Sequence, residues 1–352
     1  MQTRQSVKDI EAAQEVDSLF LLGSASLQQS RNGPFWRLEL RDATGSVDAK
    51  IWSPQSQDYT ELSAGQMVRV EGRAQLFREQ VQVTVERLRV LSPEEMAQQD
   101  MRHFMLASPY PVHDMWEELM ALCKKELHYA PWAKVLRLAF KDEEVQSRFC
   151  SIPAAKGVHH AYVGGLLEHT LSVAGLAMRV ADHYPHLDRQ ILLMGAVFHD
   201  MGKIWEFSGG LVNDYTDDGR LLGHMELVLE YLSPLLTKAG LETALARHLK
   251  HLILSHHGQP EFGSARLPQT PEALALHYVD NIDAKMAQCQ SIFSDWDSGQ
   301  TGWSGYQVTL GRFMHQPERT PVPPVAPSPP TEKAARPRKP ALEDQCLSLL
   351  KV

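Results

Sequence analysis

The sequence has few cysteines, and none are paired at the spacing of a binding motif. Only four occur among 352 residues, scattered at Cys123, Cys150, Cys289 and Cys346. Disulfide-stapled chains and zinc sites built from thiolates need closely placed cysteines, commonly as CxxC. This scarcity argues against both a disulfide framework and a cysteine-based zinc cage.

Long apolar runs are missing as well. The longest, Ile191–Phe198, spans eight residues, whereas a helix that crosses a membrane needs about 20. The first twenty residues carry mixed charge and lack the apolar segment of a secretion signal. These absences argue against membrane association and predict a cytoplasmic protein.

Positive charge is also in short supply. The formal net charge is -8 at pH 7, which argues against a protein that coats nucleic acid through bulk charge. A local basic groove is still compatible with this balance. Histidine, in contrast, is plentiful, with 16 residues, and the histidine positions indicate where the chemistry lies.

Residues 16–91 alternate in the manner of β-strands. In FWRLELRD, Trp36, Leu38 and Leu40 alternate with charged residues, and VQVTVERLRV repeats the pattern. Asn-Gly and Asp-Ala-Thr-Gly stretches between such runs supply turn residues. About five short strands in roughly 75 residues fit a small closed barrel of the OB type.

The rest of the chain changes character along its length. Residues 1–15 form an N-terminal extension, and 92–111 are a polar linker with room for a short helix. Helical periodicity takes over in 112–313. Residues 314–352 are a proline-rich tail, since nine of the 21 prolines lie there, a composition that favours a disordered extension. The predicted fold class is multidomain α and β, with the barrel followed by an all-α domain.

The helical domain repeats histidine and aspartate on its apolar faces. His224, for example, is expected on one stripe with Leu221, Leu227 and Val228. The full set comes from five segments: His169; His199 with Asp200; His224; His256 with His257; and Asp280. A lone core histidine is most simply explained by a hydrogen bond to a backbone carbonyl.

Several ionisable groups in one core call for a shared explanation. Each would otherwise need its own buried partner, whereas a metal ion satisfies them together. Imidazole and carboxylate ligands without thiolate suit manganese, iron, cobalt, nickel or catalytic zinc.

These residues resemble a known signature. His169, then His199-Asp200, then Asp280 is similar to the H...HD...D pattern of the HD-domain metal-dependent phosphohydrolases, and His224 with SHHG resembles their subset with a second metal ion. The order of FCSIPAAKGVHHAYVGGLLEHTLSV, FHDMGKIWEFSG, LLGHMELV, LILSHHGQPEFGS and LHYVDNIDAKM, behind a nucleic-acid-binding barrel, resembles the YhaM-type 3'-5' exoribonucleases. The resemblance covers residues 16 to 300, and the proline-rich tail departs from it.

The resemblance implies divalent metal ions, two of them, with manganese favoured. The implied ligands are His169, His199, Asp200 and Asp280 for the first ion, and Asp200, His224, His256 and His257 for the second. Two cations that flank a phosphodiester activate a water for attack on phosphorus. Asp200, as the bridging ligand, and Lys203, which would neutralise developing charge on the phosphate, are the catalytic candidates.

Residues next to the implied ligands are candidates for supporting roles. The pair His159-His160 and Asp283 are expected to support the ligands from behind or to touch the substrate. Asp283 can exchange roles with Asp280, because residues three apart on a helix share a face. The sequence leaves the choice between these two aspartates open.

The barrel offers candidates for contact with nucleic acid. An OB-type barrel stacks bases on exposed aromatic rings and follows the phosphates with Lys or Arg. The candidates are Phe35, Trp52, Tyr59 and Phe77, with Arg37, Lys50, Arg73 and Arg78. Trp36 is expected in the core. Because small barrels also need large side chains as filling, each aromatic candidate has a purely structural alternative.

Three functions stay open at this point. The favoured one is a metal-dependent 3'-5' exoribonuclease that hydrolyses single-stranded RNA, or single-stranded DNA, to nucleoside 5'-monophosphates. The alternative is a phosphohydrolase of small or cyclic nucleotides with a regulatory barrel. An RNA-binding adaptor with a decayed site is disfavoured by the complete ligand set. The oligomeric state, a homo-oligomer included, is left open.

Overall fold

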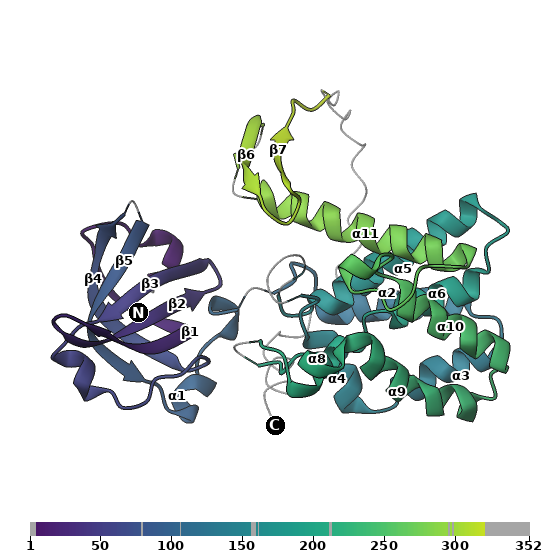
Figure 1. Ribbon diagram of the computed structural model, residues 1–352, viewed down its shortest axis with the longest axis horizontal. Helices are drawn as coiled ribbons and strands as arrows, with labels where there is room; N and C mark the ends of the chain where they lie inside the picture. The colour runs from purple at the N-terminus through teal and green to yellow at the C-terminus, as the bar shows by residue number, and fades with distance from the viewer. Residues whose placement is uncertain are drawn as a thin grey trace, which may run out of the picture. The chain divides into compact units, whose positions relative to one another are not determined.

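A computed structural model describes residues 5–78, 80–105, 107–155, 160, 162–210, 213–294, 296–297 and 299–320. The contacts divide the chain into two compact units, Met1–Ala284 and Lys285–Val352. The first unit holds the β-barrel and most of the helices, and the second holds the end of the last helix and a small hairpin (Figure 1).

The N-terminal strands close into a barrel, as the alternating pattern predicts. They are β1 (Glu15–Ser30), β2 (Gly33–Asp42), β3 (Gly45–Ile51), β4 (Met67–Phe77) and β5 (Gln80–Val90). Their order around the barrel is β1-β2-β3-β5-β4, with β3 and β5 parallel and the other pairs antiparallel. Two short 3-10 helices, Val7–Asp9 and Gln55–Asp58, accompany the strands.

Alternation along β2 shows why the barrel forms. Trp36, Leu38 and Leu40 are buried in its core, whereas Arg37 is exposed between them. Side chains of a strand point to opposite faces in turn, so every second residue of β2 fills the interior. The expectation that Trp36 lies in the core is correct.

The predicted linker contains the short helix α1 (Pro93–Ala97) and the 3-10 turn Met101–His103. A capping box starts α1: the Ser92 hydroxyl accepts from the Glu95 backbone N–H, and the Glu95 carboxylate accepts from that of Ser92. Phe104 is buried with Met67 and Leu91 in a small cluster. This part of the linker therefore packs on the barrel.

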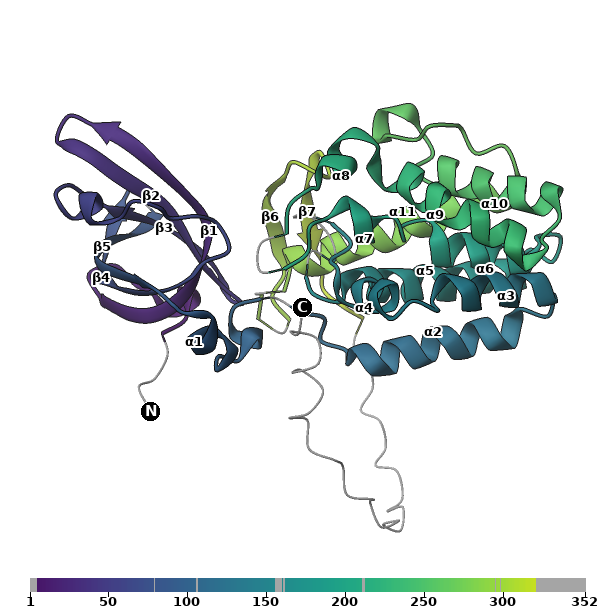
Figure 2. The ribbon, with the colours of Figure 1, turned by 90° about the horizontal axis from the view of Figure 1, so that it is seen from below.

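Helices make up the following domain. They are α2 (Val112–Glu126), α3 (Ala130–Ala139), α4 (Glu143–Ser151), α5 (Gly165–His183), α6 (Arg189–Phe198), α7 (Lys203–Glu206), α8 (Asp217–Leu221), α9 (Gly223–Ala239), α10 (Thr243–Ser255) and α11 (Pro271–Ile292), with the 3-10 turn Pro260–Phe262 before α11. The central helix is α6, which packs against α2, α5 and α10 (Figure 2).

Two details of the predicted helical pattern are wrong. Leu221 does not share a helix with His224: it ends α8 and is 81% exposed, because α9 begins only at Gly223. The helical pattern also stops at Ile292 rather than continuing to residue 313. A hairpin of β6 (Gly302–Gln307) and β7 (Arg312–Gln316) follows, in a stretch whose glycines disfavour a helix.

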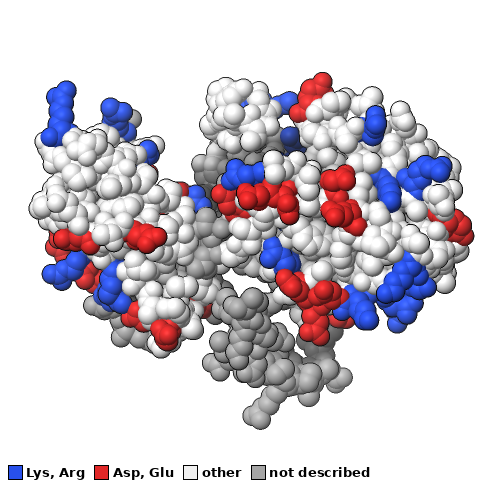
Figure 3. Space-filling model, turned by 60° about the horizontal axis from the view of Figure 1, so that its bottom comes forward, with Lys and Arg blue, Asp and Glu red and all other residues white. Residues whose placement is uncertain are grey.

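The surface carries charges of both signs. Figure 3 shows Lys and Arg side chains and Asp and Glu side chains over the face that it draws. No helix among the described residues is long and apolar enough to span a membrane. The proline-rich stretch from residue 321 onward lies outside the described residues.

Candidate metal centre

The apolar helix α6 delivers the HD pair into the core. The Asp188 side chain caps its start by accepting from two backbone N–H groups of the first turn. Ile191–Phe198 is buried throughout, as expected of a helix that is apolar on all sides. His199 and Asp200 follow directly and are 0% and 3% exposed. The apolar run thus explains how two ionisable groups come to be buried.

A histidine of α5 and an aspartate of α11 meet this pair. His169 Nε2 lies 3.2 Å from His199 Nε2 and 3.2 Å from Asp280 Oδ1. Asp200 Oδ2 lies 3.5 Å from the Nε2 atoms of both histidines. We call His169, His199, Asp200 and Asp280 the first cluster.

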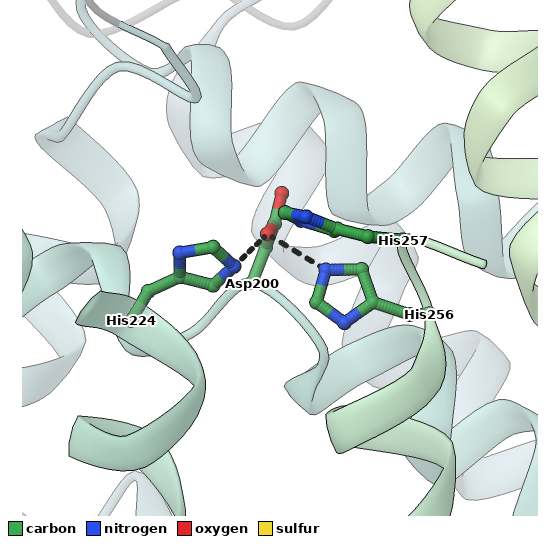
Figure 4. Close-up of side chains that lie close together, drawn as sticks. All are labelled: Asp200, His224, His256 and His257. Atoms are coloured by element: carbon green, nitrogen blue, oxygen red, sulfur yellow. Dashed lines mark ion pairs between the residues drawn. The ribbon is translucent and has the colours of Figure 1, made fainter. Parts of the chain in front are cut away.

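The other oxygen of Asp200 faces a second group. Asp200 Oδ1 lies 3.5 Å from His224 Nε2 and 3.6 Å from His256 Nε2, and Figure 4 shows both rings directed at this carboxylate. The ring of His257 lies beside that of His256, with the centroids 4.2 Å apart. We call Asp200, His224, His256 and His257 the second cluster. One carboxylate therefore belongs to both clusters.

Each of the four inner imidazoles is held through its Nδ1 atom. The partners of Nδ1 are Ala196 O for His199 (2.9 Å), Ile253 O for His256 (2.7 Å), Asp283 Oδ2 for His169 (2.7 Å) and Glu206 Oε1 for His224 (3.1 Å). An acceptor at Nδ1 places the proton there and leaves Nε2 as the lone-pair nitrogen. All four Nε2 atoms are thus directed at the clusters, where a bound cation would take the place of any proton on them.

The second cluster contains buried atoms whose hydrogen-bonding capacity is unused. Among the described residues, Asp200 Oδ1, His224 Nε2 and His256 Nε2 have no hydrogen-bond partner. A buried polar atom without a partner costs about 1–3 kcal/mol. Because the three atoms surround one point, a single divalent cation would satisfy them all, and the donor types suit such an ion. The residues fit a metal.

The clusters attract positive charge. Burial raises the pKa of Asp200, but Lys203 and His199 outweigh it and hold that pKa well below its ordinary value. Burial likewise raises the pKa of Asp280, and the hydrogen bond with His169 reverses the shift. Burial lowers the pKa of His169, yet Asp280 and Asp283 raise it to about 10. Two ionised carboxylates in a buried pocket are a strong attractant for a cation.

The remaining candidates of the HD segment lie close by. Lys203, the first residue of α7, donates from Nζ to Asp200 Oδ2 at 2.6 Å. At Gly202 a Cβ atom would collide with the backbone carbonyl of His224, so glycine is required there. The backbone after the HD pair therefore lies directly against the start of α9.

The structure distinguishes the two aspartates of α11. Asp280 Oδ1 faces the Nε2 atoms of His169 and His199, at 3.2 and 3.9 Å. Asp283 accepts instead at the opposite side of His169, and it also accepts from His160 Nε2 at 3.1 Å. His160 is buried behind the first cluster, whereas the neighbouring His159 lies outside the described residues.

Sequence reasoning missed three supporting residues. Glu206 holds His224, Ser172 donates to Asp283, and the Tyr162 hydroxyl bonds His160 Nδ1 at 2.8 Å. For Glu206 a signal was available, since it is an acidic residue within the otherwise apolar end of GKIWEF. The other two carry no such mark, because hydroxyl groups are common on helices and loops.

A second candidate site lies on the barrel. Phe35 and Trp52 stack with ring centroids 4.8 Å apart. Lys50 Nζ lies 5.8, 5.1 and 5.1 Å from the centroids of Phe35, Trp52 and Phe77, and the guanidinium of Arg78 lies 5.4 Å from that of Phe77. Aromatic rings and cations are thus brought together on β2, β3 and the end of β4.

A cavity of about 330 Å³ opens among these side chains. Five of the eight candidates line it: Phe35, Arg37, Lys50, Phe77 and Arg78. Arg37 also pairs with Asp48 across 3.3 Å. Tyr59 is placed elsewhere: its hydroxyl accepts from the Leu88 backbone N–H and its ring packs on the barrel core. Arg73 is exposed and does not line the cavity.

Comparison with known proteins identifies the family of each of the two domains. The family model described as HD domain matches residues 166–285, and the model described as OB-fold nucleic acid binding domain matches residues 24–91. A curated 3'-5' exoribonuclease YhaM from Bacillus subtilis is 35% identical over 277 residues, which is 78% of this chain and 87% of the relative. The chain belongs to the YhaM family of exoribonucleases.

Further relatives agree with this assignment. The 3'-5' exoribonuclease YhaM of Bacillus velezensis is 36% identical over the same shares of the two chains, and that of Bacillus pumilus is 33% identical over 80% of this chain and 88% of its own. The family resemblance and the fold class predicted from sequence are confirmed. With its HD domain, this member of the YhaM family is a metal-dependent hydrolase.

Proposed function

We propose that this chain hydrolyses single-stranded RNA from its 3' end and releases nucleoside 5'-monophosphates. The observation that carries the proposal is the shared carboxylate of Asp200, whose two oxygens face two separate groups of imidazoles. A pair of cations bridged in this way suits in-line displacement at a phosphodiester. The alternative substrate class, small or cyclic nucleotides, is not favoured by the relatives.

We assign the ligands of two divalent ions by cluster. The first cluster, with Asp280 rather than Asp283 as its final carboxylate, would hold one ion, and the second cluster would hold the other. His257 is the outermost member, since its Nδ1 lies 2.7 Å from the backbone carbonyl of Phe262. Burial lowers the pKa of His257 to about 4, so the ring is neutral. Its Nε2 atom can then offer a lone pair to a metal ion. Manganese is the favoured ion, with cobalt, iron, nickel and zinc as the other candidates.

The chain's own residues divide the work. When bound, the cations supply an activated water and stabilise charge on the phosphate oxygens. Asp200 would offer one carboxylate oxygen to the ion of each cluster. Lys203, 2.6 Å from Asp200, adds a positive group beside the position of the scissile phosphate. The histidines, held at Nδ1, would present their Nε2 atoms to the ions in a fixed orientation.

The barrel is proposed to hold the RNA strand. Phe35, Trp52 and Phe77 would stack on bases, and Arg37, Lys50 and Arg78 would contact phosphates. We assign this binding to residues 16–91 and the chemistry to residues 112–313. RNA is the proposed substrate, with single-stranded DNA as a further candidate, and a cytoplasmic location stays a prediction from the sequence.

The test is a cleavage assay on the full chain. Protein stripped of metal is incubated with 5'-labelled single-stranded RNA, with and without manganese, beside Asp200→Ala and beside a DNA of the same sequence. The expected result is a ladder that shortens from the 3' end only with metal and only with Asp200. RNA that stays intact with every metal, while small nucleotides are hydrolysed, would contradict the proposal.

A further inference from the structure

Glu206 occupies a position that the reaction outlined above does not explain. It is the last residue of α7 and is 8% exposed. Its Oε1 accepts both from the backbone N–H of His224 at 3.2 Å and from His224 Nδ1 at 3.1 Å. A single carboxylate oxygen thus contacts both the backbone at the α9 start and the ring of His224.

The other imidazole of the second cluster is held differently. His256 Nδ1 bonds to the backbone carbonyl of Ile253, three residues earlier on its own helix, and His199 has the same arrangement with Ala196. No side chain is needed for either. His224 stands at the beginning of its helix, where no preceding turn offers a carbonyl. Glu206 supplies the missing acceptor from another element.

The first cluster also contains one ring held by a backbone carbonyl and one held by a carboxylate. There the ring of His169 is held by Asp283, which also receives Ser172 Oγ and His160 Nε2. In each cluster, therefore, one imidazole is oriented by a carboxylate that comes from a different helix. The two carboxylates share no partner among the hydrogen bonds of the described residues.

The backbone around Glu206 is fixed without its side chain. The Glu206 carbonyl accepts from the Thr216 backbone N–H at 2.9 Å. A Cβ atom at Gly219 would collide with that same carbonyl, and one at Gly202 would collide with the carbonyl of His224. These close approaches persist when only the carboxylate is removed. A variant at Glu206 therefore tests the orientation of the ring rather than the course of the chain.

We propose that Glu206 is the positioning residue of the second metal site and that Asp283 serves the first, so that each site can be weakened separately. The inference rests on the two-ion assignment of the proposed function and adds which residue controls which ion. A carboxylate behind a ligating histidine fixes its tautomer and raises its basicity, and its loss weakens metal affinity by about 10- to 100-fold.

Two substitutions separate the carboxylate's charge from its role as an acceptor. Glu206→Gln keeps an oxygen that accepts from His224 but loses the charge, whereas Glu206→Ala removes both. We expect the second manganese to bind about 10-fold more weakly in Glu206→Gln and about 100-fold more weakly in Glu206→Ala, with the first ion retained. Asp283→Asn should instead weaken the ion of the first cluster.

The experiment measures manganese bound per chain against free manganese, by equilibrium dialysis with elemental analysis of the full-length protein. Glu230→Gln, an exposed residue on the same helix as His224, is the matched control and should bind like the unaltered chain. Thermal unfolding of the metal-free proteins is recorded in parallel. A purely structural Glu206 would lower the unfolding temperature and leave the two binding steps unchanged.

The outcomes are distinct. Selective loss of one binding step in Glu206→Ala, graded in Glu206→Gln, supports the inference. Two unchanged steps in Glu206→Gln, or equal weakening of both, overturn it even when Glu206→Ala fails to fold. Cleavage of labelled RNA by the unaltered chain is measured beside these titrations, so failure of the exonuclease proposal appears there and not in the metal counts.

Discussion

The two candidate sites of this chain are built in opposite ways. The first and second clusters lie inside a helical core, where His169, His199 and His256 are wholly buried. The barrel site is an open cavity, in which Phe77 is 49% exposed and a single cation, Lys50, lies near three aromatic rings. A buried ionisable group needs a compensating partner, whereas an exposed ring or cation is stable in water by itself. The groups of the first site therefore depend on one another, whereas those of the second are also stable when exposed to water.

Removal of the metal should separate the two sites most completely. We expect a strong chelator to abolish RNA shortening, because the clusters then lack the ions that carry the reaction. Binding of RNA by the barrel should change less than about twofold, since none of its cavity residues belongs to a cluster. Readdition of manganese after removal of the chelator should restore activity. Cleavage that persists in chelator would contradict the assignment.

The substitution Asp200→Ala should have a similar effect to removal of the metal. It removes the carboxylate shared by both clusters, so we expect activity to fall by roughly a thousandfold or more while RNA binding is retained. Single-turnover shortening of labelled RNA at saturating enzyme measures this change. Asp218→Ala, an exposed aspartate of α8, is the matched control and should cleave normally. Equal losses in the two variants would mean that the charge change alone is responsible.

Phe35→Ala should have the reverse effect. Loss of one stacking platform is expected to weaken RNA binding by roughly 5- to 150-fold, with little change in the rate at saturating RNA. Fluorescence titration with labelled RNA and the rate at saturation give the two numbers. Leu27→Ala, which removes an exposed apolar side chain from β1 (58% exposed), controls for a general effect on the barrel. A lower saturated rate with unchanged binding would contradict the proposed role.

The smallest expected effect concerns Lys50. If its ammonium contacts one phosphate, Lys50→Ala should reduce the slope of log affinity against log salt by about 0.7, the value for a single strand. Binding titrations at several salt concentrations measure the slope. Arg87→Ala should leave the slope unchanged, because Arg87 is 82% exposed and does not line the cavity. Identical slopes for Lys50→Ala and the unaltered chain would mean that Lys50 does not contact a phosphate of the RNA.

The contrast between the sites also explains what the sequence could predict. The five ligand segments could be found because histidine and aspartate stand out on apolar helical stripes. Glu206 and Ser172 were missed, since their importance depends on which helix ends meet in space. On the barrel, Phe35 and Tyr59 look alike in the sequence, yet one lines the cavity and the other bonds to the backbone of Leu88.

The C-terminal region shows a different limit. The stretch after Ile292 continues the apolar spacing of a helix, but its glycines favour the turns that lead into β6 and β7. In this stretch the preference of glycine for turns outweighs the apolar spacing that predicted a helix. The same reasoning applies to Leu221, where Gly223, with φ of +77°, breaks the stripe and separates α8 from α9.

The contact at Gly202 bears on how this centre can change over evolutionary time. Because backbone meets backbone there, the interval between the HD pair and the start of α9 does not depend on the size of any neighbouring side chain. Exchanges of core residues for others of similar volume usually cost less than about 1.5 kcal/mol in stability. We expect such exchanges around the centre to leave the distance between Asp200 and His224 largely unchanged, whereas any side chain at Gly202 should increase it.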